Sequence, residues 1–368
     1  MIETKQFYDY LVNSGVDFFA GVPDSLLANL CACIKENTPK SNNIITANEG
    51  NAVAMCAGYH LSTGKCGVVY MQNSGEGNIV NPLLSLADED VYSIPMLLII
   101  GWRGEPGKHD EPQHVKQGKV TISLLEAMGV DYAILDDNYE EQLSYAIQYM
   151  KNNNKPYALI VKKGTFSSYK ITPEITDYPL LREEALEVII DKLTIDDIVV
   201  STTGKTSREI FEIREKRGEG HANDFLTVGS MGHTSSIAYG VAIGTNKNVF
   251  CIDGDGSFLM HMGALAVIGS NMPKNLKYIL NDNQAHESVG GQPTCTNSID
   301  IPSIIKACGF DTVIVAKNTE EIKNGIELLR DSDSACMIIK TKQGSRDDLG
   351  RPTTTPIENK IALMEKLK

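Results

Sequence analysis

The strongest chemical signal in the sequence is a glycine-rich turn between a predicted buried strand and an apolar helix. The strand is expected at Val249–Ile252, and residues 253–257 (DGDGS) follow it directly. Glycine on both sides of Asp255 permits a tight turn and a close approach of the backbone to a ligand. Because a helix N-terminus offers free N–H groups and a positive dipole end, the turn predicts a phosphate site.

Asp255 adds a requirement for a cation at the same turn. A carboxylate next to a phosphate is unfavourable unless a metal ion bridges them, so Mg²⁺ or Ca²⁺ is expected. A second oxygen ligand should follow the neighbouring strand. Leu276–Leu280 predicts such a strand, and Asn283 comes shortly after it. The two segments together are far more specific than the three letters GDG alone.

A second segment, Gly204-Lys205-Thr206, follows the predicted strand Ile198–Val200 and suggests a nucleotide-binding loop. A P-loop requires a glycine five residues before its last glycine, and position 199 is valine. A P-loop kinase or NTPase is therefore a remote alternative. A turn rich in Thr and Ser that donates hydrogen bonds to a diphosphate fits the segment better.

The elements that must position these residues alternate between strands and helices. Short Val- and Ile-rich runs predict buried strands, and helix-period segments such as Glu140–Lys151 and Thr319–Arg330 lie between them. Continuous apolar strands that alternate with helices are typical of parallel sheets covered on both faces. The expected strands are 68–71, 96–100, 158–161, 198–200, 249–252, 276–280, 312–315 and 336–339. The predicted fold class is α/β, with two doubly wound parallel-sheet domains.

The alternation of strands and helices stops once, near residues 167–179, where Ser, Thr and Pro replace apolar residues. This composition predicts a linker. We therefore expect one domain at 1–165, a linker at 166–184 and a second domain at 185–368.

Composition and charge exclude several classes of protein. With 368 residues, 47 acidic against 34 basic side chains and a formal net charge of −13, the chain has no basic stripe for nucleic acid. No apolar run approaches the roughly 18 residues of a membrane span, and no signal peptide is recognisable. The eight cysteines show no CxxC or zinc spacing. Reduced thiols in a cytoplasmic protein are therefore expected.

GDG followed by an asparagine at the end of the next strand resembles the diphosphate and metal motif of thiamine-diphosphate enzymes. The resemblance implies that Mg²⁺ is bound by Asp255, Asn283 and the backbone carbonyl of Ala285. The rest of the turn would contact the cofactor: Gly254, Gly256 and Ser257. Residues 1–165 would then bind the pyrimidine ring, and residues 185–368 would bind the diphosphate and the metal, without a middle domain.

The same family carries a glutamate at a strand end in the pyrimidine-binding half, and Glu49 in residues 46–52 (TANEGNA) matches it. The resemblance implies that its proton promotes the cofactor tautomer that activates the thiazolium carbon. A dry pocket that raises the pKa of the carboxyl group would suit this role. Judged by itself, Glu49 could instead be a solvent-facing acid at the start of a helix.

Two further segments match cofactor-binding positions of the family. The carbonyl of Gly229 would accept a hydrogen bond from the pyrimidine amine, and Met231 would wedge between the two cofactor rings. From sequence alone, a buried Met beside a glycine turn explains that segment equally well. Gly204, Lys205 and Thr206 would reach the cofactor diphosphate.

Within this family the chain resembles the small phosphonopyruvate and sulfopyruvate decarboxylases, on phrases such as 72–78 (QNSGEGN), 285–293 (AHESVGGQP) and 344–352 (GSRDDLGRP). Sulfopyruvate decarboxylases often divide the two halves between subunits, so one fused chain favours the phosphonate enzyme. The resemblance then implies decarboxylation of 3-phosphonopyruvate to phosphonoacetaldehyde, in phosphonate biosynthesis of the 2-aminoethylphosphonate type. Sulfopyruvate decarboxylation is the alternative.

A doubly anionic substrate needs local cations in an acidic protein. Residues 103–119 contain several basic side chains and three glycines, which predict a loop at the cleft, with a solvated surface loop as the alternative. The residues expected to bind substrate are Asp24, Ser25, Asn73, Arg103 and Lys108. The histidines expected to bind substrate or transfer protons are His109, His114 and His286.

The resemblance also bears on assembly. In this family the two halves meet across a subunit interface, so a homodimer or a larger homo-oligomer is implied. A catalytically silent binding subunit is disfavoured, because the glutamate and both metal-binding side chains are present.

Overall fold

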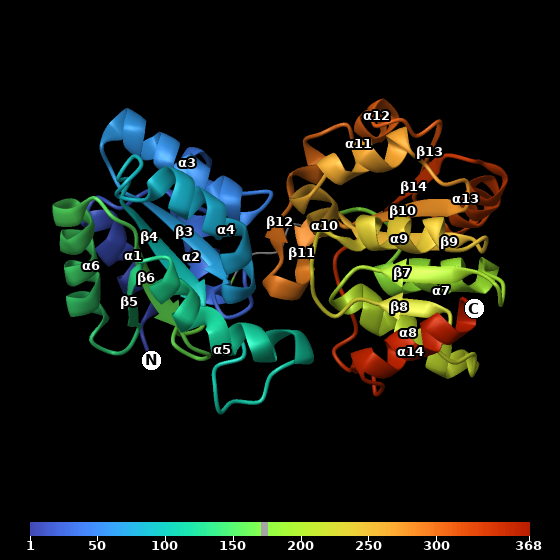
Figure 1. Ribbon diagram of the computed structural model, residues 1–368, viewed down its shortest axis with the longest axis horizontal. Helices are drawn as coiled ribbons and strands as arrows, with labels where there is room; N and C mark the ends of the chain where they lie inside the picture. The colour runs from blue at the N-terminus through green and yellow to red at the C-terminus, as the bar shows by residue number, and fades with distance from the viewer. Residues whose placement is uncertain (171–175) are drawn as a thin grey trace. The chain divides into compact units, whose positions relative to one another are not determined.

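The apolar runs of the sequence lie side by side in two six-stranded sheets, in which every described strand pairing is parallel (Figure 1). The computed structural model describes residues 1–170 and 176–368. These residues form two units. Unit 1 contains residues 1–170 and 288–292, and unit 2 contains residues 176–287 and 293–368.

The sheet of unit 1 has the strand order β2-β1-β3-β4-β6-β5. Its strands are β1 (Phe19–Gly21), β2 (Asn43–Ile45), β3 (Gly67–Gln72), β4 (Met96–Gly101), β5 (Asp131–Ile134) and β6 (Tyr157–Val161). Its helices are α1 (Thr4–Asn13), α2 (Ala28–Asn37), α3 (Glu49–Thr63), α4 (Glu76–Pro82), α5 (Pro112–Ala127) and α6 (Tyr139–Asn153). The order reverses at β1, which has β2 on one side and β3 on the other. Parallel sheets bind ligands at the carboxyl ends of strands beside such a reversal.

Two apolar layers join this sheet to its helices. One layer contains α1, α2 and α6, with Phe7 and Leu143 fully buried. The other contains α3, α4 and α5, with Val53 and Leu125 fully buried. Alternate residues of the central strands enter the two layers, because successive side chains of a strand point to opposite faces.

The sheet of unit 2 has the order β13-β14-β10-β9-β7-β8, which reverses at β7. Its strands are β7 (Ile198–Ser201), β8 (Asp224–Leu226), β9 (Val249–Gly254), β10 (Leu276–Asp282), β13 (Thr312–Ala316) and β14 (Ala335–Lys340). The helices on one face are α7 (Arg182–Lys192), α8 (Lys205–Arg217) and α13 (Thr319–Asp331). Those on the other face are α9 (Thr234–Ile243), α10 (Asp255–Met260), α11 (Gly263–Ser270), α12 (Ile301–Ala307) and α14 (Pro356–Lys366). Two short strands, β11 (Ala285–His286) and β12 (Gln292–Pro293), lie outside both large sheets.

The predicted α/β class, with two parallel sheets and no middle domain, is confirmed, and every expected strand is present. The sequence reasoning did not find four strands of the large sheets, β1, β2, β5 and β8. Three of them have only three residues each, which is too short for a recognisable apolar run. The fourth, β5, is largely exposed at a sheet edge and so lacks a buried pattern.

Two expected connecting segments, the linker at 166–184 and the loop at 103–119, can be compared with the structure. The expected linker at 166–184 includes residues 171–175, which lie outside the described residues. At its ends, Phe166 is buried in unit 1 and α7 begins at Arg182. The expected loop at 103–119 is wrong in its second half, because Pro112 opens α5. Proline suits the first turn of a helix, where its missing N–H would have had no helical partner.

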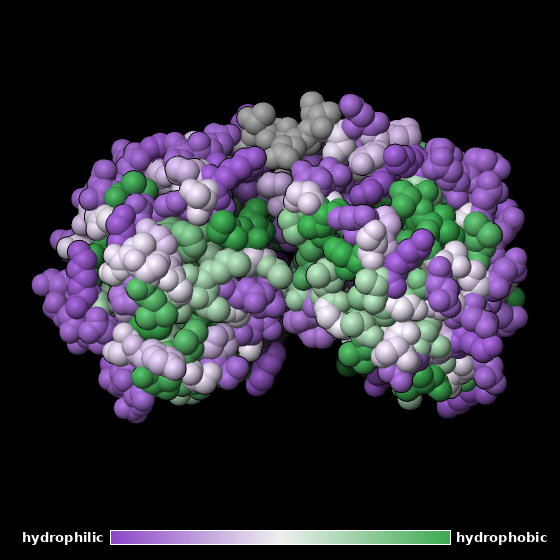
Figure 2. All heavy atoms as spheres, turned by 90° about the horizontal axis from the view of Figure 1, so that it is seen from above, coloured by the Kyte–Doolittle hydropathy of each residue, from purple (hydrophilic) through white to green (hydrophobic). Residues whose placement is uncertain are grey.

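The surface carries mostly hydrophilic side chains, with apolar areas between them, in the view of Figure 2. Among the described residues, no helix combines the length and the hydropathy that a bilayer-spanning segment requires.

Two helical glycines of unit 1 offer a matched test of the packing. A Cβ on Gly118 in α5 would lie 1.8 Å from the carbonyl oxygen of Gly104, whereas a Cβ on Gly58 in α3 would meet nothing within 4 Å. Gly118→Ala should therefore lower the free energy of unfolding by about 1–3 kcal/mol through overpacking. Gly58→Ala should raise it by about 0.4–1 kcal/mol. Denaturant titration measures both changes, and equal effects of the two substitutions would contradict the close approach at Gly118.

Candidate functional site

Asp255 and Asn283 lie at the carboxyl ends of neighbouring strands in unit 2. β9 ends at Gly254 and β10 ends at Asp282, and Asn281 pairs with Gly254 in the parallel register. Asp255 is the first residue of α10, and Asn283 is the first residue beyond β10. Both side chains are buried. The fold therefore brings the two side chains expected to bind metal to one edge of the sheet.

Asp255 is held by a buried chain of hydrogen bonds that ends at a second carboxylate. Thr294 Oγ1 donates to Asp255 Oδ2 at 2.7 Å, and the hydroxyls of Thr294 and Thr296 lie 2.9 Å apart. Thr296 Oγ1 donates to Asp282 Oδ1 at 2.8 Å, and Lys340 forms an ion pair with Asp282. Burial, and then the charge of Asp282, raise the pKa of Asp255 to about 7. A cation beside Asp255 would relieve this unfavourable burial of negative charge.

The amide of Asn283 has a defined orientation. Its Nδ2 donates to Glu287 Oε2 at 2.8 Å, and its Oδ1 accepts from the backbone N–H of Ala285 at 3.1 Å. Gln284, between them, has a φ of +61°, in the left-handed region that few residues other than glycine adopt. Such conformations cluster at ligand sites, and this one folds the backbone of Ala285 back toward Asn283.

These oxygen donors suit a hard cation. Carboxylate, amide and backbone carbonyl oxygens are ligands that Mg²⁺ takes in proteins, and phosphate oxygens and water complete its octahedron. Across residues 1–170 and 176–368, no group of three or more His, Cys, Asp or Glu side chains could hold a metal. A metal ion at Asp255 and Asn283 could take phosphate oxygens of a bound cofactor as further ligands.

Side chains from two other segments close around the turn at 254–257. A Cβ on Gly256 would lie 2.8 Å from Nδ1 of His286 and 3.1 Å from Cε of Met231, so only glycine fits there. The N–H of Gly232 donates to Ser257 Oγ at 3.1 Å. Burial lowers the pKa of His286 to about 4, so this histidine is neutral at neutral pH. It can exchange hydrogen bonds but does not supply positive charge.

Gly229 lies in a segment that folds back toward the end of β7. Thr203 Oγ1 donates to the carbonyl of Val228 at 2.8 Å, and Ser230 has a φ of +59°. Gly229 and Met231 are only partly buried. The segment therefore reaches the same carboxyl edge of the sheet as the turn at 254–257.

Gly204, Lys205 and Thr206 begin α8 directly after β7. Gly204 has a φ of +89°, which permits the sharp entry into the helix, and Thr206 is buried. Lys205 Nζ forms an ion pair with Glu287 Oε1 at 3.0 Å and donates to Ser345 Oγ at 2.7 Å. The three residues expected to reach the diphosphate thus stand at the same sheet edge as Asp255.

Glu49 in unit 1 is a buried carboxyl group at the first residue of α3. Asn48 caps this helix by accepting from the N–H of Asn51. Glu49 is 4% exposed, and burial raises its pKa although Asn78 Nδ2 donates to Oε2 at 2.6 Å. A Cβ on Gly75 would lie 2.3 Å from Oε1, so the glycine leaves room for the carboxyl group. The alternative of a solvent-facing acid is excluded.

Asp24 is fully buried between the ends of β3 and β4. Gln72 Nε2 donates to its Oδ1 at 2.6 Å, and the N–H of Leu26 donates to its Oδ2 at 3.0 Å. A Cβ on Gly101 would lie 2.1 Å from Oδ2. Burial raises the pKa of Asp24. With both oxygens occupied and no exposed surface, Asp24 is better suited to holding this sheet edge together than to contacting a substrate.

Arg103 follows β4, and its guanidinium group donates hydrogen bonds to a carboxylate and to a hydroxyl. Its Nε donates to Asp110 Oδ2 at 2.8 Å, its Nη2 pairs with the other oxygen of Asp110, and its Nη1 donates to Ser25 Oγ at 3.0 Å. Asn73 fixes the backbone of Arg103, with which it exchanges two hydrogen bonds. Burial alone would raise the pKa of Asp110, but Arg103 outweighs it and holds that pKa well below its usual range. Arg103 is therefore oriented and partly neutralised by Asp110, a partner that the sequence reasoning missed.

The other basic residues of 103–119 do not gather around Arg103. Lys108 and His109 are exposed before α5, and the two lysines of α5 in this segment are exposed as well. His114 on α5 is buried, and its Nδ1 makes no hydrogen bond within the described residues. Burial, and then the charge of Arg103, lower the pKa of His114. Of the basic side chains beyond Arg103, only His114 is enclosed by the protein.

The sequence reasoning did not find several buried or partly buried polar residues beside the site. Asn78 donates a hydrogen bond to Glu49, Thr294 donates one to Asp255, and Glu287 accepts one from Asn283. Isolated polar residues outside a known motif leave no recognisable pattern in the sequence. Glu76, at the start of α4, is 2% exposed, and burial raises its pKa to about 8. Its Oε1 has no hydrogen-bond partner among the described residues.

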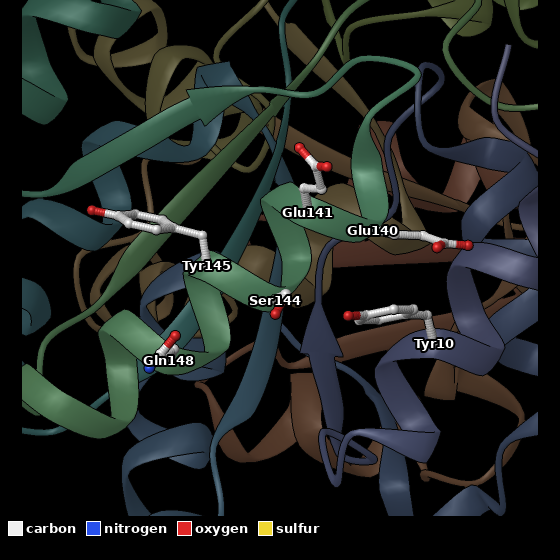
Figure 3. Close-up of a pocket in the computed structure, with 6 residues that line it drawn as sticks. All are labelled: Tyr10, Glu140, Glu141, Ser144, Tyr145 and Gln148. Atoms are coloured by element: carbon white, nitrogen blue, oxygen red, sulfur yellow. The ribbon is translucent and has the colours of Figure 1, made fainter.

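A hollow on unit 1 lies between α1 and α6, away from every residue expected to be functional (Figure 3). It is lined by Tyr10, Glu140, Glu141, Ser144, Tyr145 and Gln148. Two carboxylates and no basic side chain make it unsuitable for an anionic substrate.

Comparison with known protein families identifies both halves of the chain. Residues 3–128 match the N-terminal TPP binding domain of thiamine pyrophosphate enzymes, and residues 202–339 match the C-terminal TPP binding domain. Glu49 and Arg103 lie in the first range, and Asp255 and Asn283 lie in the second.

Comparison with individual relatives identifies a narrower group within the thiamine pyrophosphate enzymes. The chain is 33% identical to a phosphonopyruvate decarboxylase of Streptomyces viridochromogenes, over 97% of this chain and 93% of that protein. It is 30% identical to a sulfopyruvate decarboxylase of Methanosarcina acetivorans, over 86% of this chain and 85% of that protein. A solved benzoylformate decarboxylase from Polynucleobacter necessarius matches at 12% identity and a TM-score of 0.40, over 94% of this chain and 100% of that one. This last similarity is too distant to support an argument.

The two domain matches and the nearly full-length identities agree with the predicted resemblance. The chain belongs to the thiamine pyrophosphate enzymes, in the decarboxylase family that includes phosphonopyruvate and sulfopyruvate decarboxylases.

Proposed function

We propose that the protein decarboxylates 3-phosphonopyruvate to phosphonoacetaldehyde and CO2, with thiamine diphosphate and Mg²⁺, as a step of phosphonate biosynthesis. The observation that carries this proposal is the 33% identity with a phosphonopyruvate decarboxylase over 97% of the chain. In this reaction a proton replaces the departing CO2 on the substrate carbon, so the protein must manage both an anion and a proton.

Unit 2 would hold the metal and the diphosphate. Asp255, Asn283 and the carbonyl of Ala285 are the protein ligands that we assign to Mg²⁺. The turn at 254–257 and the start of α8 would contact the diphosphate, where Lys205 supplies positive charge. Support comes from the all-oxygen donor set and from the raised pKa of Asp255, since a neighbouring cation favours the ionised carboxylate.

Unit 1 would hold the proton that activates the cofactor. When bound, thiamine diphosphate supplies a carbon nucleophile and an electron sink for decarboxylation. Asn78 donates to Oε2 of Glu49, so Oε1, next to Gly75, is the oxygen that we expect to carry the exchangeable proton. Burial raises the pKa of Glu49 and thereby favours its protonated form.

Substrate recognition is assigned to Arg103 and Ser25. Nη1 of Arg103 already donates to the Ser25 hydroxyl, which orients both groups for a tetrahedral anion. We assign Met231 and Gly229 to the cofactor rings, and His114 and His286 to neutral hydrogen-bonding or proton-transfer roles. Lys108 and His109 are exposed in this structure and are retained only as residues that could contact a bound substrate.

Sulfopyruvate is the alternative substrate, because a sulfonate is also tetrahedral and needs similar donors. The expectation that a fused chain favours the phosphonate enzyme is not discriminating, since the Methanosarcina acetivorans sulfopyruvate decarboxylase also aligns over most of this chain. The higher identity and coverage of the phosphonopyruvate decarboxylase decide our preference. A P-loop kinase or NTPase is the remote alternative, because position 199 is valine where such a loop requires glycine.

Assembly and compartment complete the proposal. We infer a homodimer or larger homo-oligomer from the family resemblance. We also infer a cytoplasmic enzyme, because all eight cysteines are free thiols and most of them are buried.

The substrate assignment is tested by comparing turnover of phosphonopyruvate, sulfopyruvate and pyruvate with thiamine diphosphate and Mg²⁺ present. Aldehyde formation should be fastest from phosphonopyruvate, by at least about tenfold in kcat/KM, which corresponds to about 1.4 kcal/mol of transition-state preference. Preferential turnover of sulfopyruvate would retain the chemistry and reject the substrate. No turnover of any 2-oxo acid would reject the proposed reaction.

Glu49→Gln tests the proton assignment. The amide keeps the shape of the side chain but has no acidic proton, so kcat should fall by about 10²–10⁴-fold while cofactor binding and thermal unfolding stay close to wild type. Steady-state kinetics and a thermal scan measure both properties. Glu36→Gln, an exposed glutamate of α2, is the control and should change neither. Retention of most activity by Glu49→Gln would remove Glu49 from the mechanism.

Asp255→Ala tests the metal assignment. Because a carboxylate ligand is lost, the Mg²⁺ concentration that supports half-maximal binding of thiamine diphosphate should rise by at least about tenfold. Equilibrium dialysis of the cofactor against increasing Mg²⁺ measures this change. Asp333→Asn, on the surface of the same unit, is the control. An unchanged Mg²⁺ requirement in Asp255→Ala would show that Asp255 is not a ligand.

A further inference from the structure

Glu287 lies at the centre of a partly buried cluster of charges that touches two parts of the candidate site. We propose that Glu287 is a positioning residue that turns the amide oxygen of Asn283 toward the metal and holds Lys205 in place for the diphosphate. The inference rests on the proposed metal and cofactor site, and it assigns a role to a residue that contacts neither group directly.

The hydrogen bonds of Glu287 determine which of the two ends of the Asn283 amide, NH2 or oxygen, points toward Glu287. Its Oε2 accepts from Asn283 Nδ2 at 2.8 Å and from Arg182 Nη1 at 3.0 Å, while its Oε1 accepts from Lys205 Nζ at 3.0 Å. A carboxylate paired with two cations is ionised and can only accept hydrogen bonds. Asn283 must therefore present its NH2 group to Glu287, which leaves its carbonyl oxygen Oδ1 for other partners. A metal ion can be bound only by that oxygen.

The carboxylate of Glu287 is held in turn by Arg182, which is itself paired with Glu209. Arg182 is 5% exposed and donates from Nε and Nη2 to the two oxygens of Glu209, at 2.7 Å each. Glu209 is 1% exposed. This bidentate pair leaves Nη1 of Arg182 aimed at Glu287, so the carboxylate has little freedom to rotate. Groups that bind metal ligands from the outer side commonly set ligand orientation in this way.

The same carboxylate also controls Lys205. The lysine has two hydrogen-bond partners, Glu287 Oε1 and the hydroxyl of Ser345 at 2.7 Å. Lys205 stands at the start of α8, beside the end of β7. Glu287 thus connects a metal ligand after β10 with a cation after β7, and it can adjust the metal and diphosphate sites together.

Glu287→Gln is the direct test, because it keeps the shape and removes the charge. Both oxygens of Glu287 accept from donors, so the NH2 group of the new amide would face a donor in either orientation. Where the NH2 group takes the place of Oε2, Asn283 can keep a hydrogen bond to it only by turning its own amide over. The metal would then meet an NH2 group. We expect the Mg²⁺ concentration for half-maximal binding of thiamine diphosphate, measured by equilibrium dialysis, to rise by about 10–100-fold. High Mg²⁺ should restore most of the binding.

A complementary double variant separates positioning from general stability. Asn283→Asp combined with Glu287→Gln keeps the net charge and reverses the donor and acceptor in the pair. The amide at 287 can then donate to the carboxylate at 283, which remains an oxygen ligand. The Mg²⁺ requirement should return at least about tenfold toward wild type, even if Glu287→Gln by itself folds poorly. A double variant that folds but binds Mg²⁺ no better than Glu287→Gln overturns the proposal.

Glu212→Gln is the matched control. Glu212 also accepts from an arginine of unit 2, Arg346, but has no bond to Asn283 or Lys205. It should leave the Mg²⁺ requirement unchanged. If Glu287→Gln lowers thermal stability as Glu212→Gln does and leaves the Mg²⁺ requirement unchanged, the role of Glu287 is purely structural and the inference is wrong. If Asp255→Ala also leaves that requirement unchanged, the metal site itself is wrong, which is a separate failure.

Discussion

Burial of carboxyl groups at the carboxyl ends of parallel strands is the constraint on which the site depends. In unit 2, Asp255 and Asp282 are both buried and joined through two threonines, while Lys340 is the ion-pair partner of Asp282 alone. Negative charge in such a place is costly unless it is matched by a cation or a proton. We therefore assign the compensation of the Asp255 charge to a metal ion bound together with the cofactor.

Unit 1 also contains a buried carboxyl group, Glu49, but here we expect a proton rather than a cation to compensate the burial. Among the described residues, Glu49 accepts a side-chain hydrogen bond from the neutral amide of Asn78 and forms no ion pair, and burial raises its pKa. Burial in such a setting favours the protonated form, which suits the role in cofactor activation that we propose for Glu49. The two units thus resemble each other in fold but differ in how they compensate a buried acid. In unit 2 we assign compensation to a metal, and in unit 1 to protonation.

We propose that recognition of the substrate depends on how the basic side chains are restrained rather than on how many are present. Residues 103–119 are rich in basic side chains, yet most of these side chains are exposed, and Arg103 is bound by Asp110 and Ser25. A restrained guanidinium loses less conformational freedom on binding an anion. Phosphonate and sulfonate groups make similar demands on such a site, so substrate choice depends on contacts finer than the family motifs.

The sequence by itself determined the α/β class, the two sheets and the segments that carry Asp255, Asn283 and Glu49. It could do so because each segment carries a short local pattern: Asp255 lies between a buried strand and a helix, Asn283 follows a buried strand, and Glu49 begins a helix. Only the tertiary structure decided that Asp110 restrains Arg103 and that Glu287 orients Asn283. It also revealed α5 and the short edge strands. Long polar side chains choose partners by proximity in space, and a three-residue strand is stabilised by its neighbours, so neither leaves a local pattern in the sequence.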